Sequence, residues 1–326
     1  MVVGRDDLER HLTELVRRTG DPRAGIYGPG SLSWEVNREG VIMLGGGCAA
    51  LMQLAHPYVA HAVDQHSHTR ADPIGRFNRT FGHVFAMVFG DLDHALASAR
   101  RVHRLHTTIR GVIREDVGRF RRGDRYRAND EEALLWVHAT LVDTALRVYE
   151  LLVQELSPLE RDAYYEESKL FAYLFGIPDD VLPPTWEAFQ RWYAETIASD
   201  TIAVGEPASE MRRFLFQPPH PAHAPLVAWF EVFTAGLLPP KLRRELGFSW
   251  TALDRQLFAR SIPVLRLAHR ALPRRLRYFP AYVEARRRLA GKPAHDRVGR
   301  WLERLALRSI TPSEAFLARQ AAAATT

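Results

Sequence analysis

The sequence is poor in cysteine and in lysine. Its 326 residues include one cysteine, Cys48, so no disulfide can form within the chain, and no Cys-x-x-Cys metal motif exists. Only three of the 44 basic residues are lysines, and the rest are arginines spread along the chain. The net charge of +6 reflects that bias, and no aromatic or glycine-rich recognition motif accompanies the arginines. We therefore expect no nucleic-acid partner.

Long apolar runs are also missing. The longest, GVIMLGGGCAALMQLA at residues 40–55, is short for a bilayer crossing and stops at His56-Pro57. The first residues contain acids and bases but no apolar core of signal-peptide length. We therefore expect a cytoplasmic protein with no transmembrane span.

The alternation of apolar and polar residues that is typical of β-strands is absent too, and apolar residues recur at helical spacing instead. Residues 5–18 have one apolar helical face, and 91–114 and 130–155 predict long helices that aspartates open. A charged connection, 116–129, separates the last two. With 46% hydrophobic residues the chain can bury a sizeable core. We predict one all-α domain over residues 1–326, with prolines at its corners.

The C-terminal part, residues 271–326, predicts basic helices. Its arginines are typical of the solvated outer faces of helices in an arginine-rich protein. The alternative is a basic amphipathic surface that makes peripheral contact with anionic lipid or with an acidic partner.

Histidines, by contrast, are concentrated in one part of the chain. Nine of the 14 lie between residues 56 and 138: His56, His61, His66, His68, His83, His94, His103, His106 and His138. Known signatures for zinc or for a nucleophilic serine do not occur near them. The three glycines at 45–47 lack the Gly-Lys-Ser/Thr of a phosphate loop; they instead allow close approach of a neighbouring segment or of a flat ligand.

Two stripes of polar residues mark the stretch RVHRLHTTIRG, residues 101–111. On a helix, Arg104 and Thr108 share one face, and His103, His106 and Arg110 share the next. A surface helix with mixed polar side chains would show the same pattern, so these residues alone leave both interpretations open.

His138 lies in the apolar stretch LWVHATLV, residues 135–142. A buried imidazole destabilises a protein unless it is paired, so the ring must find a hydrogen bond or be used. A histidine on an apolar helix can be an axial haem ligand. It can equally be a core histidine with a hydrogen-bond partner.

Several motifs together resemble one family, the catalytic domain shared by rubber oxygenases (latex-clearing proteins) and the oxygenases of mycophenolic acid biosynthesis. They are LMQLAHPYVAHAVDQHS (51–67), DPIGRFNRT (72–80), VHRLHTTIRG (102–111) and YRANDEEALLWVHATLVDT (126–144), followed by Tyr149-Glu150. The resemblance spans roughly residues 20 to 270.

This resemblance implies an all-α fold with a globin-like core that binds haem b and uses O₂. The histidine that holds the haem iron on the proximal side matches His138. An arginine and a threonine on the distal side match Arg104 and Thr108, which would polarise and orient dioxygen. Arg76, Arg79 and Arg110 are candidates to pair with the haem propionates.

Two departures from the family separate this chain from the rubber-cleaving members. Thr107 stands where they can carry a distal lysine, so His106 or water is the candidate for the sixth iron position. No acid matches their catalytic carboxylate, and Val88 or a neighbour occupies that region. Both departures argue against polyisoprene as the substrate.

The leading hypothesis is a haem b-dependent oxygenase that acts with O₂ on a small apolar, unsaturated substrate such as a terpenoid or prenyl chain, with an electron donor for the iron. Three alternatives stay open: a non-haem oxidoreductase whose metal the clustered histidines ligate, a non-catalytic helical protein that binds haem or an apolar ligand, and a structural helical protein with satisfied core histidines.

Overall fold

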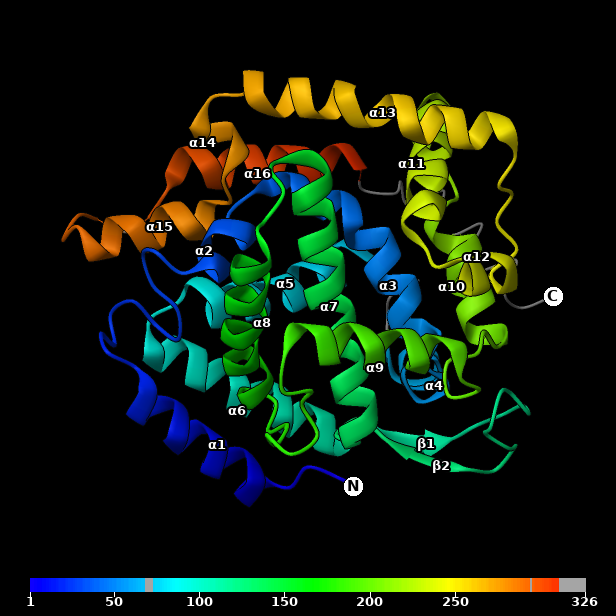
Figure 1. Ribbon diagram of the computed structural model, residues 1–326, viewed down its shortest axis with the longest axis horizontal. Helices are drawn as coiled ribbons and strands as arrows, with labels where there is room; N and C mark the ends of the chain where they lie inside the picture. Colours follow the sequence, from blue (N-terminus) through cyan, green and yellow to red (C-terminus); the bar gives the residue numbers. More distant parts are fainter. Residues whose placement is uncertain (68–72, 294, 311–326) are drawn as a thin grey trace.

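The computed structural model describes residues 1–67, 73–293 and 295–310, with the side chains of 73–79 and 305–310 left aside. Over this part of the chain, sixteen α-helices account for most of the structure, and one sheet has two strands (Figure 1). The all-α class is confirmed, whereas the globin-like core stays a prediction.

The helices and strands follow one another along the chain with short connections. In order they are α1 (Arg5–Arg18), α2 (Leu32–Asn37), η1 (Gly40–Gly45), α3 (Gly46–Leu54), α4 (Pro57–His66), α5 (Pro73–Phe89), α6 (Leu92–Thr108), β1 (Arg110–Val112), β2 (Arg125–Arg127), α7 (Glu131–Leu152), α8 (Pro158–Tyr173), α9 (Trp186–Ala198), α10 (Glu206–Leu215), η2 (Pro221–His223), α11 (Ala224–Leu237), α12 (Pro240–Glu245), α13 (Ala252–Ala271), α14 (Arg274–Arg277), α15 (Pro280–Leu289) and α16 (Arg297–Ile310).

Helix α7 lies at the centre of the molecule (Figure 1). Its start is set by Asp130, whose side chain accepts a hydrogen bond from the backbone N–H of Ala133 at 3.2 Å. Two faces of α7 enter two different apolar cores: Trp136 belongs to one, and Leu134 and Leu135 belong to the other. Burial on both faces explains why the sequence of this helix is apolar nearly all round.

The glycines at 45–47 permit close helix packing. A Cβ atom on Gly45 would lie 2.6 Å from Cγ2 of Thr144 in α7, and one on Gly47 would lie 2.7 Å from Oγ1 of Thr234 in α11. Close approach to a neighbouring segment, one of the two predicted uses of these glycines, is therefore what the structure shows. Cys48 follows them in the core, and burial raises the pKa of its thiol to about 12, so the thiol stays protonated.

The predicted helix 91–114 is wrong at its C-terminal end. Helix α6 stops at Thr108, and the chain continues as β1, which pairs antiparallel with β2 inside the predicted connection 116–129. Gly111 allows this pairing, because a Cβ there would lie 2.5 Å from the hydroxyl of Tyr126. Strands of three residues are too short for alternation to show in the sequence.

Segments from opposite ends of the chain meet at a buried histidine–glutamate pair. The Nε2 atom of His269, near the end of α13, lies 2.9 Å from Oε2 of Glu39, just before η1. The backbone pairing of Glu39 with Tyr278 extends this contact to the end of α14. The basic C-terminal helices therefore pack on the N-terminal third.

Within the described residues, no single helix combines the length and apolarity needed to cross a membrane. Gly40–Leu54 and Pro57–His66 pass that test only as a pair, and they are bent by 102° at the break between them. The bend coincides with His56-Pro57, where α3 has ended and α4 begins with the proline.

Candidate functional site

His138 lies in the N-terminal half of α7 and is 3% exposed. Neither of its ring nitrogens has a hydrogen-bond partner among the described residues. Burial lowers the pKa of this imidazole to about 4, so the ring is neutral at pH 7. A neutral buried imidazole with both nitrogens unpaired costs stability, and it is the form of histidine that binds a metal.

The surroundings of His138 are apolar. The ring of Phe171 from α8 stacks on the imidazole, with centroids 6.3 Å apart and planes inclined by 21°. Phe175 extends the aromatic contact, since its ring centroid lies 5.3 Å from that of Phe171. Leu134 and Leu135 belong to the same apolar core as Phe171. No pattern in the sequence points to Phe171, because its contact with His138 depends on how α7 and α8 pack.

Three other histidines of the cluster, His61, His66 and His83, have hydrogen-bond partners, whereas His138 has none among the described residues. His61 donates from Nδ1 to the carbonyl of Pro57 at 3.0 Å, and its Nε2 accepts from the backbone N–H of Arg114 at 3.1 Å. His66 is hydrogen-bonded to the carbonyl of Arg110 at 3.0 Å, and His83 to the hydroxyl of Ser98 at 3.1 Å. These rings hold segments together.

His56 is the nearest comparison, because it is fully buried as well. Its Nδ1 accepts from the backbone N–H of Tyr58 at 3.2 Å and so caps the start of α4. Its Nε2 has no partner in the described part of the chain, and burial lowers its pKa to about 3. One nitrogen of His56 is therefore used by the fold, whereas neither nitrogen of His138 is.

Arg104 and Thr108 share one face of α6, as their spacing predicts, and both are exposed. The hydroxyl of Thr108 donates to the carbonyl of Leu105 at 2.7 Å. The guanidinium of Arg104 has no ion-pair or hydrogen-bond partner among the described side chains. Neither the guanidinium of Arg104 nor the hydroxyl of Thr108 is therefore held by a hydrogen bond or ion pair to another described side chain.

The predicted stripe of His103, His106 and Arg110 is wrong in its last member, since only His103 and His106 lie on α6. His103 is buried, His106 is half-buried, and Arg110 lies in β1, beyond the end of α6. Ile109 adopts extended backbone angles, so Arg110 is not one helical turn from His106. The exposed side chain of Arg110 stays a candidate for a ligand carboxylate, while its carbonyl accepts from His66.

Three residues named in the sequence analysis lie partly or wholly outside the described structure. The side chains of Arg76 and Arg79, and the whole of His68, lie outside the described part of the structure. Val88, which the resemblance places where the rubber-cleaving enzymes would have a carboxylate, is a buried apolar residue whose carbonyl accepts from the indole of Trp34 at 2.9 Å. It supplies no acid or base.

Helices α6 and α7 contribute to one apolar core, but Arg104 and Thr108 lie on the exposed face of α6 and His138 is buried on α7. Leu92, Leu96 and Ala99 of α6 pack in the same apolar cluster as Leu134 and Leu135, which precede His138 on α7. In the described ranges, no three histidine, cysteine or acidic residues come together to hold a metal ion. The histidine cluster of the sequence is therefore spread over separate structural positions.

Comparison with known proteins supports the resemblance that the motifs suggest. A family model described as ER-bound oxygenase mpaB/B'/rubber oxygenase, catalytic domain, matches residues 34–267. Uncharacterized proteins from Mycobacterium bovis and Mycobacterium tuberculosis are each 27% identical over 241 residues, which cover 70% of this chain and 89% of theirs. No solved structure matches the chain with significance.

Proposed function

This chain belongs to the family of mpaB/B' and rubber oxygenase catalytic domains, and from that premise we propose that it is a haem b-dependent oxygenase acting on an apolar, unsaturated substrate. Members of this family are oxygenases, which use O₂. The haem, the residues and the substrate class are the proposal. One observation carries it: the buried imidazole of His138, whose two nitrogens have no partner among the described residues.

The residues present fit a haem ligand at His138. An axial ligand must be a neutral imidazole, and burial keeps His138 neutral by lowering its pKa to about 4. Apolar and aromatic side chains such as Phe171 suit the flat macrocycle. A ligand that coordinates one nitrogen would also remove part of the desolvation penalty that the ring now carries.

The proposed roles in binding oxygen and haem on the distal side belong to residues of α6 and of β1, which follows it. Haem, when bound, would supply the iron at which O₂ is activated. The guanidinium of Arg104 would donate charge-assisted hydrogen bonds to oxygen, and the hydroxyl of Thr108 would turn from the carbonyl of Leu105 to orient it. His106 and Arg110 are proposed to contact the haem from the same part of the chain.

The substrate class is inferred from the apolar surroundings and from the departures noted in the sequence. With Val88 buried and no acid in its place, a carboxylate-assisted cleavage like that of the rubber-cleaving members has no base in this position. A small terpenoid or prenyl alkene is the proposed substrate, with dioxygen addition across its double bond. The electron donor and the cytoplasmic location stay predictions.

A haem protein without turnover is the second candidate, because the exposed Arg104 and Thr108 could serve a ligand rather than a reaction. A histidine-ligated non-haem metal has less support, since the described residues form no cluster of three ligands. Consumption of O₂ with an alkene distinguishes the oxygenase from the haem-binding protein, and iron without a Soret band would identify the non-haem alternative.

The absorption spectrum of the full chain, expressed with a haem precursor, tests the proposal. We expect a Soret band that shifts on reduction with dithionite and is absent from His138→Ala. Oxygen uptake with a panel of terpenoid alkenes would then test turnover. If the purified chain shows no Soret band and takes up no added haemin, the proposal is wrong.

Peripheral membrane contact is a separate part of the proposal, and helix α13 supports it. Leu253, Leu257, Val264 and Leu267 recur at helical spacing along α13, and each is between 40 and 72% exposed. Exposed arginines flank them on the same helix. An apolar row beside a basic row is typical of helices that lie on anionic bilayers, where an apolar substrate would also be found.

A further inference from the structure

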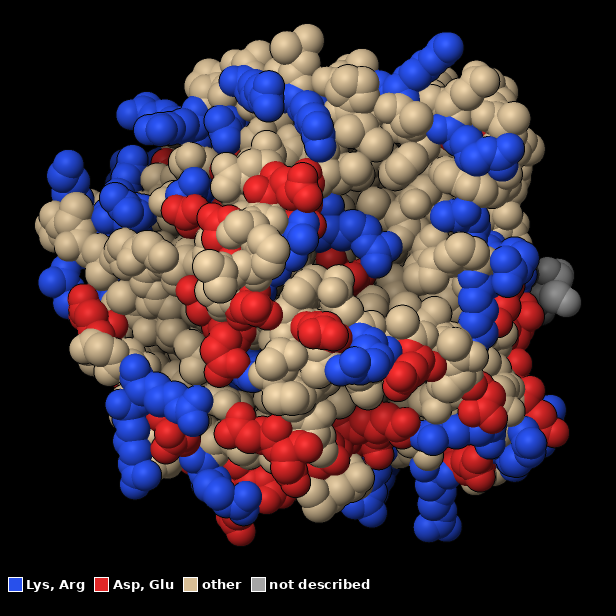
Figure 2. Space-filling model, in the orientation of Figure 1, with Lys and Arg blue, Asp and Glu red and all other residues tan. Residues whose placement is uncertain are grey.

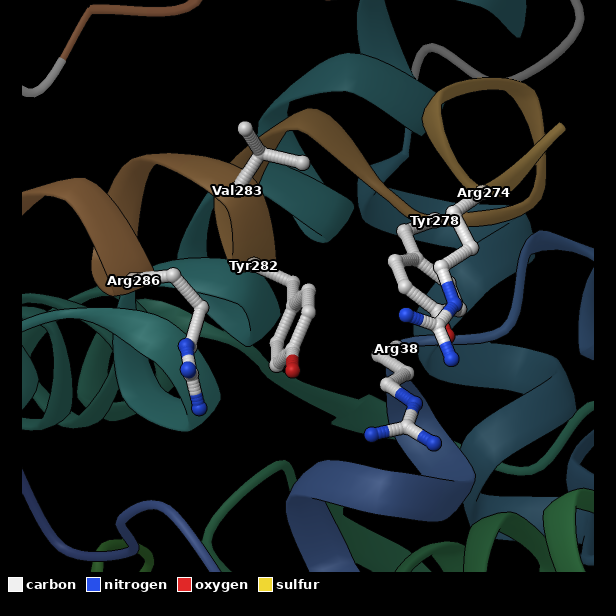
Figure 3. Close-up of a pocket in the computed structure, with 6 residues that line it drawn as sticks. All are labelled: Arg38, Arg274, Tyr278, Tyr282, Val283 and Arg286. Carbon is white, nitrogen blue, oxygen red and sulfur yellow. The ribbon is translucent and has the colours of Figure 1, made fainter.

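A pocket of about 400 Å³ lies where the end of α2 meets α14 and α15. Figure 3 shows the six residues that line it: Arg38, Arg274, Tyr278, Tyr282, Val283 and Arg286. Three of the six are arginines, two are tyrosines, and none is acidic. The pocket is made by elements other than α7 and α8, which carry His138 and Phe171.

Arg38 is held between the two tyrosines. Its guanidinium carbon lies 5.0 Å from the ring centroid of Tyr278 and 5.8 Å from that of Tyr282. In Figure 3 its guanidinium lies below and between the two rings. These cation–π contacts fix the side chain without using all of its N–H donors.

The two carboxylates beside the pocket already pair with basic side chains. Glu39 is buried, with Nε2 of His269 at 2.9 Å from one oxygen and with Arg38 and Arg277 at 3.5 Å from the other. Glu35 lies 3.8 Å from Arg38. Each of these acids therefore pairs with at least one arginine, and neither lines the pocket.

Arg274 and Arg286 remain uncompensated at the rim. Both are exposed, and neither has an ion pair or a hydrogen bond to any side chain in the described part of the chain. Four guanidinium groups, those of Arg38, Arg274, Arg277 and Arg286, thus face two carboxylates, which leaves an excess of two positive charges. Figure 2 shows basic side chains over the region where Figure 1 places α14 and α15.

We propose that this pocket binds a small organic phosphate, with the phosphate between Arg274 and Arg286 and the organic part against Tyr278, Tyr282 and Val283. A dianionic phosphate matches the charge excess, and the planar guanidinium forks match its oxygens. The volume is within the range of small-molecule sites, roughly 300–1,000 Å³. The aromatic and apolar wall supplies the contact that a bare inorganic ion would not use.

Titration calorimetry of the full chain at low salt tests the proposal with three probes: inorganic phosphate, phenyl phosphate and phenol. We expect phenyl phosphate to bind with one-to-one stoichiometry and more tightly than inorganic phosphate, because its ring can pack on the tyrosines. Phenol, which lacks the charge, is expected to bind at least about tenfold more weakly than phenyl phosphate.

Variants separate the pocket from the general charge of the surface. Arg274→Gln and Arg286→Gln should each weaken phenyl phosphate binding by about tenfold or more, because each removes charge-assisted hydrogen bonds. Arg275→Gln removes an exposed arginine from the same helix that does not line the pocket, and it should leave the affinity within about twofold. Thermal melting of the three variants checks that they fold alike.

The phosphate can come from a soluble molecule or from a lipid headgroup, and vesicles distinguish the two. The ligand is a headgroup if the chain binds phosphatidic acid vesicles but not phosphatidylcholine vesicles, and if phenyl phosphate displaces the chain from the phosphatidic acid vesicles. If phenyl phosphate binds and does not displace vesicles, the ligand is soluble. The proposal is overturned if no probe binds saturably, or if Arg275→Gln weakens binding as much as Arg274→Gln does.

Discussion

The imidazole of His138 stacks on the ring of Phe171, with 6.3 Å between centroids, and this contact positions the ring without a hydrogen bond. Its two nitrogens are left without partners among the described residues. A core histidine is normally retained for its hydrogen bonds, so its presence here needs another reason. Coordination of a haem iron by one nitrogen is the reason that we propose.

Replacing His138 should therefore cost function and little stability. His138→Leu removes two unpaired polar atoms and keeps an apolar side chain in the core, so the haem-free chain should unfold at an equal or higher urea concentration. Haem content measured by the pyridine haemochrome spectrum should fall to background. His56→Asn is the matched control: it keeps an acceptor for the N–H of Tyr58 and should keep haem. A large loss of stability in His138→Leu with haem retained would contradict the proposed role.

Thr108→Val should reduce O₂ consumption while haem binding persists. The hydroxyl that it removes makes only a local hydrogen bond to Leu105. We expect a loss of about tenfold or more in the alkene-dependent rate, since one donor at a developing charge contributes on that order. Thr13→Val is the control, because the hydroxyl of Thr13 also donates to a carbonyl one turn back, at 2.8 Å, on an exposed helix. Equal rates for both variants would exclude a role for Thr108.

Acid should destabilise the chain through His56. Burial lowers its pKa in the folded state to about 3, whereas the unfolded chain takes up the proton near pH 6.5. The contribution of the neutral ring to the free energy of unfolding is therefore complete above pH 6.5 and is lost as the pH falls. Between pH 7 and pH 5 the free energy of unfolding should fall by roughly 2 kcal/mol through this one group. His56→Asn should show a drop that is smaller by that amount in urea titrations at the two pH values. An unchanged drop would mean that another group is responsible.

Lys241 should be a structural lysine. Its ammonium donates to the carbonyls of Ile197, Ser199 and Ile202 at 2.9, 2.6 and 2.6 Å, and so holds the chain that follows α9. Lys241→Met leaves three carbonyls without that donor and should lower the free energy of unfolding by about 2 kcal/mol. Lys292→Met, at an exposed position, should change it by less than about 0.5 kcal/mol. Urea unfolding of both variants checks the difference.

The exposed row on α13 predicts binding to anionic vesicles. Leu253→Gln combined with Leu267→Gln should reduce cosedimentation with phosphatidylglycerol vesicles by about tenfold, because two apolar side chains no longer enter the bilayer. Leu159→Gln, at a leucine of α8 that is 82% exposed, is the control and should bind as the native chain does. If native chain and double variant bind alike, α13 is not the contact.

The family and its helical class follow from the sequence, and so does the candidate ligand. Helical spacing predicts α1 at its observed bounds, and the motifs around His138 identify the family that the match over residues 34–267 confirms. The Arg104–Thr108 face also forms as predicted, because both residues lie within one helix and local geometry suffices to place them. Whether they contact oxygen stays a prediction.

Contacts between segments distant in the sequence could not be read from it. The end of α6 depends on the pairing of β1 with β2, the ring of Phe171 reaches His138 only because α8 packs on α7, and the charge excess at Arg274 and Arg286 appears only once Glu39 is shared among its partners. The spacing of residues fixes which of them share a helix face. Which faces meet, and which polar atoms are left without partners, depends on packing, and tertiary structure alone decided it.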